Sequence, residues 1–228
     1  MQNDLLRYKK GQKVCVADTE TDGLNSLINL PWQISWVDCE ISPNNNKILE
    51  DHDYYIDWGD EWADNLERFI NEINKFKKIL HFDKAKYHRE KQSPEAVWAI
   101  FKKRLYDPET IIAGHNFLGF DIYMINHWRK KMGLPSDYSY LDRVIDTRAL
   151  GLAMTQNVAA SFLNDTERTS WQYKLIRMNK HNRRLKSNQT FLLKELDVEF
   201  DEDKLHEGLY DVKMCFENLK KLIWKVEI

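Results

Sequence analysis

Two carboxylates followed by a glycine are the first residues in this sequence that could do chemistry. Asp18 and Glu20 follow an apolar, β-branched run at residues 14–17, and Gly23 comes just after them. Side chains two apart on an extended backbone point to the same side. Two carboxylates at the end of a buried strand repel each other unless a cation lies between them. Because 36 of the 228 residues are acidic, such a pair also arises by chance, and it predicts a metal site only if other ligands join it.

Two later segments could supply those ligands. Residues 114–121 form a loop with two glycines that ends at Asp121, where a helix is predicted to begin. The alternative for Asp121 is the favourable interaction of an acid with a helix N-terminus. His206 and Asp211 are five apart, about 140° around a helix, so we expect His206 to precede a helix and Asp211 to lie one turn inside it. A histidine beside a metal cluster can take a proton from water; the alternative is an ordinary surface residue.

The elements that must position these residues follow from the apolar pattern. Three strands come first, then two helices, a strand, a helix, a short strand and a final helix. The predicted strands are residues 14–17, 32–39, 48–56, 111–114 and 144–145, and the predicted helices are about residues 60–79, 94–105, 120–132 and 208–226. This order predicts an α/β fold with a mixed sheet flanked by helices, whose first three strands form an antiparallel meander.

In order, the acidic segments resemble the three motifs of the DnaQ-like 3′→5′ exonuclease family, in its DEDDh branch. The family's Asp-x-Glu-Thr-x-Gly is present at residues 18–23, its Gly-His-Asn-x-x-x-Phe-Asp at residues 114–121, and its His-x4-Asp at residues 206–211. Asp146-Thr147 resembles a further Asp-Thr pair of the family. The tyrosine branch would need Tyr four residues before the last aspartate, and that position is Glu207. The resemblance runs from about residue 14 to residue 222.

The resemblance implies a ribonuclease-H-like fold: one domain over residues 1–228, with a mixed five-stranded sheet of three antiparallel strands followed by parallel strands. Relative to the shortest members, the chain has a helical insertion at about residues 59–110 and a basic insertion at about residues 155–190. The implied activity is 3′→5′ exonuclease cleavage of DNA, single-stranded in our interpretation, with release of nucleoside 5′-monophosphates.

The implied mechanism is hydrolysis with two Mg²⁺ or Mn²⁺ ions. Asp18, Glu20 and Asp211 would hold one ion, Asp18 would bridge to the second, Asp121 would act on the second, and His206 would be the general base. Ligands that are all oxygen atoms fit such hard cations and argue against zinc.

Further residues are candidates for substrate contacts. Those near the motifs are Thr21, Gly23, Leu24, His115, Asn116 and Phe117. For Leu24, as a wedge against the terminal base, and for Phe117, the alternative is core packing. The basic insertion mixes cations with aromatic residues, as single-stranded nucleic acid binding requires; its alternative is a solvated loop or a surface for a protein partner. The candidates there are Arg168, Trp171, Lys174, Arg177, Arg183 and Arg184.

Composition leaves the partner open and constrains the compartment. The net charge of −2 and a pI of about 6.4 exclude a strongly basic nucleic-acid-binding domain. Cys15, Cys39 and Cys215 are odd in number and far apart, so we expect neither disulfides nor a zinc knuckle, and a reduced cytoplasm. No signal peptide or membrane span is predicted. The many Lys and Asn residues favour an AT-rich bacterial or phage source.

Several functions compete with a DNA exonuclease. The expected partner is single-stranded DNA or the 3′ end of duplex DNA, and the nearest alternative is the same chemistry on RNA or short oligonucleotides. A catalytically silent binding module on the same fold is the alternative from another class. A proofreading subunit with a polymerase or other replication protein as partner is the last.

Overall fold

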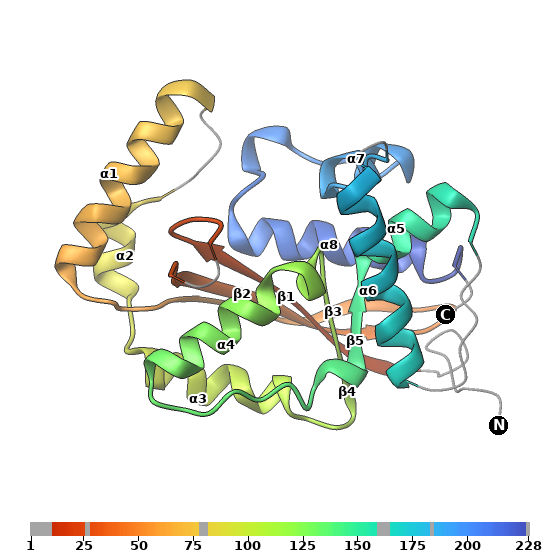
Figure 1. The fold of residues 1–228 in the computed structure, drawn as a ribbon, viewed down its shortest axis with the longest axis horizontal. Coiled ribbons are helices and arrows are strands. Elements are labelled where there is room, and N and C mark those ends of the chain that lie inside the picture. The colour runs from red at the N-terminus through yellow and green to blue at the C-terminus, as the bar shows by residue number, and fades with distance from the viewer. Residues whose placement is uncertain (1–10, 26–27, 78–81, 159–164, 183–184, 227–228) are drawn as a thin grey trace.

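A five-stranded sheet forms the centre of the molecule. The computed structural model describes residues 11–25, 28–77, 82–158, 165–182 and 185–226. Its strands are β1 Gln12–Thr21, β2 Pro31–Ile41, β3 Asn46–Tyr55, β4 Thr110–Gly114 and β5 Val144–Asp146. Their order across the sheet is β3-β2-β1-β4-β5 (Figure 1). The β1–β2 and β2–β3 pairs are antiparallel, and the β1–β4 and β4–β5 pairs are parallel. The predicted mixed sheet is therefore confirmed.

Strand β1 lies in the middle of the sheet and extends beyond its predicted end. Val14 to Ala17 are all buried, as expected of a strand covered on both faces. Pairing with β2 continues to Thr21, with Asp18 opposite Ser35 and an irregularity between Glu20 and Thr21. Both acids therefore lie within the strand rather than in the turn after it, and a hydrogen-bonded ladder fixes their backbone.

Eight α-helices occur in the part of the chain that the structure describes. They are α1 Asp60–Lys77, α2 Lys84–Glu90, α3 Pro94–Leu105, α4 Asp121–Lys131, α5 Thr147–Gln156, α6 Asp165–Asn182, α7 Gln189–Glu195 and α8 Gly208–Leu222. In Figure 1, α3 and α4 lie on one side of the sheet and α8 lies on the other. Helix α8 contacts β1 and β2, and α5 and α7 pack on α8. None of the helices among these residues is long and apolar enough to cross a membrane.

The four predicted helices are present, and four others were missed. Helices α2 and α7 have seven residues each, too few to show a periodicity. Helix α6, in the basic stretch, buries Arg168, Gln172 and Asn179 together with Leu175 and Ile176. Because polar residues share its inward face, no apolar stripe marks it in the sequence.

Helices α1 and α2 project from one end of the sheet (Figure 1). They are held by a second apolar cluster, separate from the main core, in which α1 packs on aromatic residues of β2, β3 and α2. The buried members of that cluster are Trp32, Tyr55, Ala63, Leu66, Ile70 and Tyr87. This part of the predicted helical insertion thus has a core of its own.

Candidate active site

The end of β1 places two acids on one side of the strand and ties the residue between them to a third. Asp18 and Glu20 are both partly exposed, and Thr19 between them is buried. The backbone N–H and the hydroxyl of Thr19 both donate to Oδ1 of Asp121, at 3.1 and 2.6 Å. Asp121 is the first residue of α4 and is only 2% exposed. Strand β1 and helix α4 are thereby joined at the point where the carboxylates gather.

Helix α8 brings a fourth acid to the same place. A Cβ on Gly208 would lie 2.5 Å from Oγ of Ser35, so the helix can approach β2 this closely only with glycine at its start. Asp211, in the first turn, accepts a hydrogen bond at Oδ2 from the backbone N–H of His206. Its Oδ1 is buried and has no hydrogen-bond partner among the described residues. His206 precedes the helix, as predicted, with a positive φ of 70° and an exposed side chain.

Three of these acids form a compact set of oxygen ligands, which we call the β1–α8 cluster: Asp18, Glu20 and Asp211. One carboxylate oxygen from each lies within 4.8 Å of the others. Asp121 is outside this set, and its Oδ1 is engaged by Thr19.

The electrostatics of the cluster are those of carboxylates without a counterion. Burial raises the pKa of Asp18 to about 6. Burial, and next the charge of Asp18, raises the pKa of Asp211 to about 8. The pKa values of Glu20 and Asp121 are also raised well above the usual range, first by burial and then by Asp18. A divalent cation would remove this repulsion and would give the orphaned Oδ1 of Asp211 a partner. The oxygen donors therefore fit Mg²⁺ or Mn²⁺.

The cluster opens into a cavity of about 530 Å³, a size typical of ligand pockets. Most of the predicted site residues line it, and among the described lining residues none is Lys or Arg. The predicted residues that line it are Asp18, Glu20, Thr21, Gly23, Leu24, His115, Asn116, Asp121, His206 and Asp211. The structure thus brings together segments nearly 200 residues apart in the chain.

Phe117 is the exception among the predicted residues near the motifs. It is completely buried in the main core, and its side chain packs where a Cβ on Gly114 would otherwise stand. The prediction that it contacts substrate is wrong, and the packing alternative is confirmed. In this loop, His115 and Asn116 line the cavity, whereas Phe117 packs into the core.

Asp146 holds that loop in place. Although fully buried, its carboxylate accepts hydrogen bonds from the backbone N–H groups of Asn116, Leu118 and Arg148, at 2.9 to 3.0 Å. Nδ1 of His115 lies 3.0 Å from the hydroxyl of Thr147. Asn116 has the left-handed φ of 61° that this turn requires. The Asp-Thr pair seen in the sequence therefore orders the loop that leads to Asp121.

Among the described residues, none of the cations predicted in the basic insertion lines the cavity. Arg168 is only 5% exposed, and its guanidinium donates to the carbonyl of Asp142. It ties α6 to the short turn that precedes β5, so its predicted contact with nucleic acid is wrong. Trp171 is half-buried against the core, and Lys174 and Arg177 are exposed on α6. Two further candidates, Arg183 and Arg184, lie outside the described residues.

Several cavity residues were not predicted from the sequence. They are Thr19 of β1, Phe69 and Ile73 of α1, Phe120, Asn188, Gln189, Thr190 and Leu205. For Phe69 and Ile73 a signal existed, since their spacing of four puts them on one face of the helix. In the sequence, however, the same spacing is what core packing of an amphipathic helix produces, so it does not distinguish the two roles.

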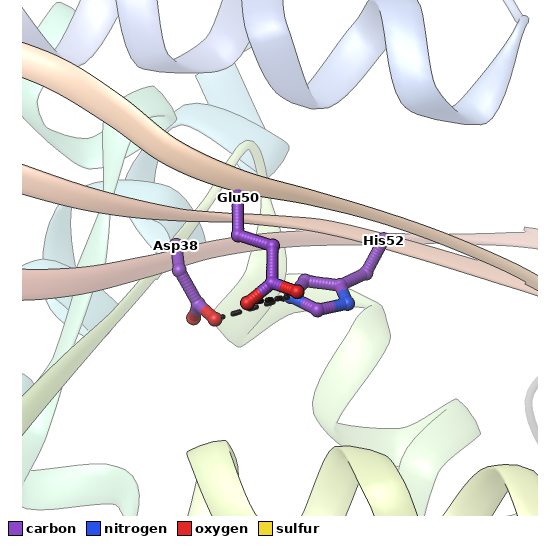
Figure 2. Close-up of side chains that lie close together, drawn as sticks. All are labelled: Asp38, Glu50 and His52. Atoms are coloured by element: carbon purple, nitrogen blue, oxygen red, sulfur yellow. Dashed lines mark hydrogen bonds and ion pairs between the residues drawn. The ribbon is translucent and has the colours of Figure 1, made fainter.

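A second group with potential ligands lies elsewhere on the sheet (Figure 2), and we call it the β2–β3 cluster: Asp38, Glu50 and His52. Nε2 of His52 lies 3.2 Å from Oδ2 of Asp38 and 3.4 Å from Oε2 of Glu50. Nε of Arg104 lies 2.7 Å from the same Oδ2 of Asp38. A guanidinium thus already neutralises the carboxylate of Asp38, and we interpret this cluster as a hydrogen-bonded network that links β2, β3 and α3.

Comparison with known proteins shows the fold. No protein-family model and no curated protein matches the sequence. The zinc-bound complex of E. coli exonuclease I with single-stranded DNA has a TM-score of 0.63 and 13% identity, covering 92% of this chain and 40% of that one. A product-bound structure of exonuclease I has a TM-score of 0.62 and 14% identity, and the match covers 96% of this chain and 44% of that one. A complex of exonuclease I with the SSB C-terminus has a TM-score of 0.61 and 14% identity, and the match covers 96% of this chain and 42% of that one.

These TM-scores show that the chain has the fold of the exonuclease I chains, in agreement with the mixed five-stranded sheet predicted from the sequence. The chain spans about 40 to 44% of the length of those exonuclease I chains.

Proposed function

We propose that the chain is a member of the DnaQ-like, DEDDh exonuclease family that removes nucleoside 5′-monophosphates from the 3′ end of single-stranded DNA. The observation that carries the proposal is the β1–α8 cluster: three carboxylates with oxygens within 4.8 Å of one another, at the wall of an open cavity. Their raised pKa values make a divalent cation the natural partner. The fold shared with exonuclease I supports the same assignment.

In this proposal each residue has a defined task. Asp18, Glu20 and Asp211 would hold one of two Mg²⁺ or Mn²⁺ ions, and Asp18 and Asp121 would serve the second. Such ions supply an activated water and neutralise charge on the leaving oxygen. His206, exposed at the cavity wall and tied through its backbone to Asp211, accepts the proton of the attacking water. Thr21, Gly23, Leu24, His115 and Asn116 surround the terminal nucleotide.

Single-stranded DNA is the favoured substrate because the similar exonuclease I structures include complexes with it. Cleavage of RNA by the same residues is the second candidate, and contacts to the sugar 2′-hydroxyl separate the two. A replication protein as partner and a bacterial or phage cytoplasm remain predictions.

The decisive test is degradation of 5′-labelled single-stranded DNA and its RNA counterpart in Mg²⁺. We expect a ladder that shortens from the 3′ end and that EDTA abolishes, with DNA cleaved faster. A 3′-labelled strand should release labelled mononucleotide at once. No metal-dependent cleavage of either polymer would contradict the proposal and would favour a binding module or a subunit that needs its partner.

A further inference from the structure

Apolar side chains stand open to the cavity that contains the carboxylates. Leu24 is 88% exposed and Phe69 is 40% exposed, although both are large and apolar. Ile73 is half-buried beside them, and all three line the cavity together with Asp18 and Asp211. Side chains of this kind, gathered in one cavity, indicate a binding surface rather than incomplete packing.

Helix α1 presents this surface from a fixed position. One face of the helix packs Leu66 and Ile70, which are 2% and 4% exposed, into the second apolar cluster. The adjacent face carries Phe69 and Ile73, four residues apart and therefore one turn from each other. The helix is held by its own core on one side and is free to contact a ligand on the other.

A hydrogen bond connects α1 to the segment that carries Leu24. Nε1 of Trp62 donates to Oδ2 of Asp22, at 3.0 Å. Oδ1 of the same Asp22 accepts from the backbone N–H of Leu30, at 2.6 Å. The turn after β1 is thus tied both to the residue that precedes β2 and to α1, and the apolar residues of the two segments line one cavity.

We propose that Phe69 and Ile73 of α1 hold the bases just upstream of the reacting nucleotide, and that α1 thereby selects unpaired 3′ ends. This inference rests on the proposed function. Because none of the described residues that line the cavity is Lys or Arg, the wall offers no cationic side chain to the phosphates upstream of the proposed metal site. The contribution of α1 to affinity would therefore come from contacts with the bases. Every base has an apolar face that can stack on an aromatic side chain. In a duplex those faces are covered by neighbouring pairs, so only an unpaired end can use the surface.

The test compares α1 variants on two substrates that differ in length. The variants are Phe69→Ala and Ile73→Ala, with Glu72→Ala as the matched control, because Glu72 lies on the same helix and its side chain is 66% exposed. The substrates are a 5′-fluorescent thymidine 12-mer and the p-nitrophenyl ester of thymidine 5′-monophosphate, which offers a single nucleotide.

We expect Phe69→Ala to raise KM for the 12-mer about tenfold, with kcat little changed, and to leave hydrolysis of the ester unchanged. Phe69→Tyr should restore the low KM. The preference for the 12-mer over the same strand in a blunt duplex should fall in Phe69→Ala and persist in Glu72→Ala. An equal loss on the ester would mean a distorted cavity and would overturn the proposal.

Binding without turnover separates this inference from the proposed function. The affinity of the 12-mer, measured by fluorescence anisotropy in Ca²⁺, should fall about tenfold in the Phe69→Ala, Ile73→Ala double variant. Wild-type affinity in that variant would refute the stacking surface even if the enzyme is active. If the wild-type protein does not cleave DNA but the double variant still binds the 12-mer more weakly, the stacking surface would be supported and the exonuclease activity would be rejected.

Discussion

The β1–α8 and β2–β3 clusters have the same number of potential metal ligands and opposite electrostatic character. In the β2–β3 cluster a guanidinium lies 2.7 Å from Asp38, and the ring of His52 stacks on Trp36 with centroids 4.6 Å apart. In the β1–α8 cluster the nearest charges are other acids, and burial raises the pKa of Asp18 and Asp211. A ligand count alone does not identify a metal site; negative charge that the protein leaves uncompensated does.

The sharpest way to break this comparison is to measure catalysis after one change in each cluster. Asp18→Asn removes a ligand of both proposed ions, and we expect kcat on single-stranded DNA to fall about 10³-fold, equivalent to ~4 kcal/mol of transition-state stabilisation. Glu50→Gln, in the other cluster, should retain wild-type activity, since Glu50 is away from the cavity and its side chain is 61% exposed. Comparable losses in both variants would show that the two clusters are not functionally distinct.

A second prediction uses the metal itself. Mg²⁺ or Mn²⁺ at about 100 times its dissociation constant should stabilise the wild-type protein by ~2.7 kcal/mol, because it binds only the folded cluster. Thermal unfolding with and without the ion measures this. We expect the ion to raise the Tm of Glu50→Gln by the same amount and to leave the Tm of Asp18→Asn unchanged. If Asp18→Asn gains as much stability as the wild type, the cation binds elsewhere.

The sequence predicted the β1–α8 cluster well because each of its acids stands beside a strong local signal. Asp18 continues an apolar strand, and Asp211 follows a glycine that begins a helix. The β2–β3 cluster carries no such signal. Asp38 and Arg104 are 66 residues apart, and only the strand register and the position of α3 bring them together. Long-range pairs of this kind depend on tertiary structure, which local patterns do not encode.

The same reasoning separates the correct and incorrect predictions around the cavity. Asn116 and Phe117 are adjacent in a motif, yet the left-handed backbone at Asn116 turns one side chain to the cavity and the other into the core. Arg168 has a basic side chain in a basic segment, yet it is buried where α6 packs on the turn before β5. Residue type and spacing predicted which segments lie together at the cavity, whereas the direction of each side chain could be learned only from the fold.

A third prediction concerns stability in the β2–β3 cluster. Asp38→Ala leaves Arg104 and His52 without their shared acceptor, and the Asp38 side chain is only 15% exposed. We therefore expect a loss of about 1–3 kcal/mol in the free energy of unfolding, measured by urea denaturation. Asn at the same position should recover part of the loss. An unchanged stability in Asp38→Ala would mean that water replaces the network at no cost.

The smallest expected effect is the pH dependence of the metal-free protein, and its sign distinguishes the clusters. The pKa of Asp211 rises from 3.8 to about 8 on folding, and that of Asp18 rises to about 6. A carboxyl with a raised pKa holds its proton more tightly in the folded state. Its contribution to stability is complete below about pH 4 and is lost as the pH rises through the folded pKa.

In EDTA, the Tm of the wild type should therefore fall between pH 5 and pH 8.5 relative to Asp211→Asn, which cannot ionise at that position. Because the neighbouring acids share protons, we expect a difference of about 1 kcal/mol, or ~2–4 °C in Tm. The Tm of Glu50→Gln should show the same pH dependence as that of the wild type. Added Mg²⁺ should reverse the trend, since the ion competes with protons and binds more tightly as the pH rises. Parallel curves for wild type and Asp211→Asn in EDTA would mean that folding does not raise the pKa of Asp211. Its charge would then be compensated within the protein, and the electrostatic difference between the two clusters would disappear.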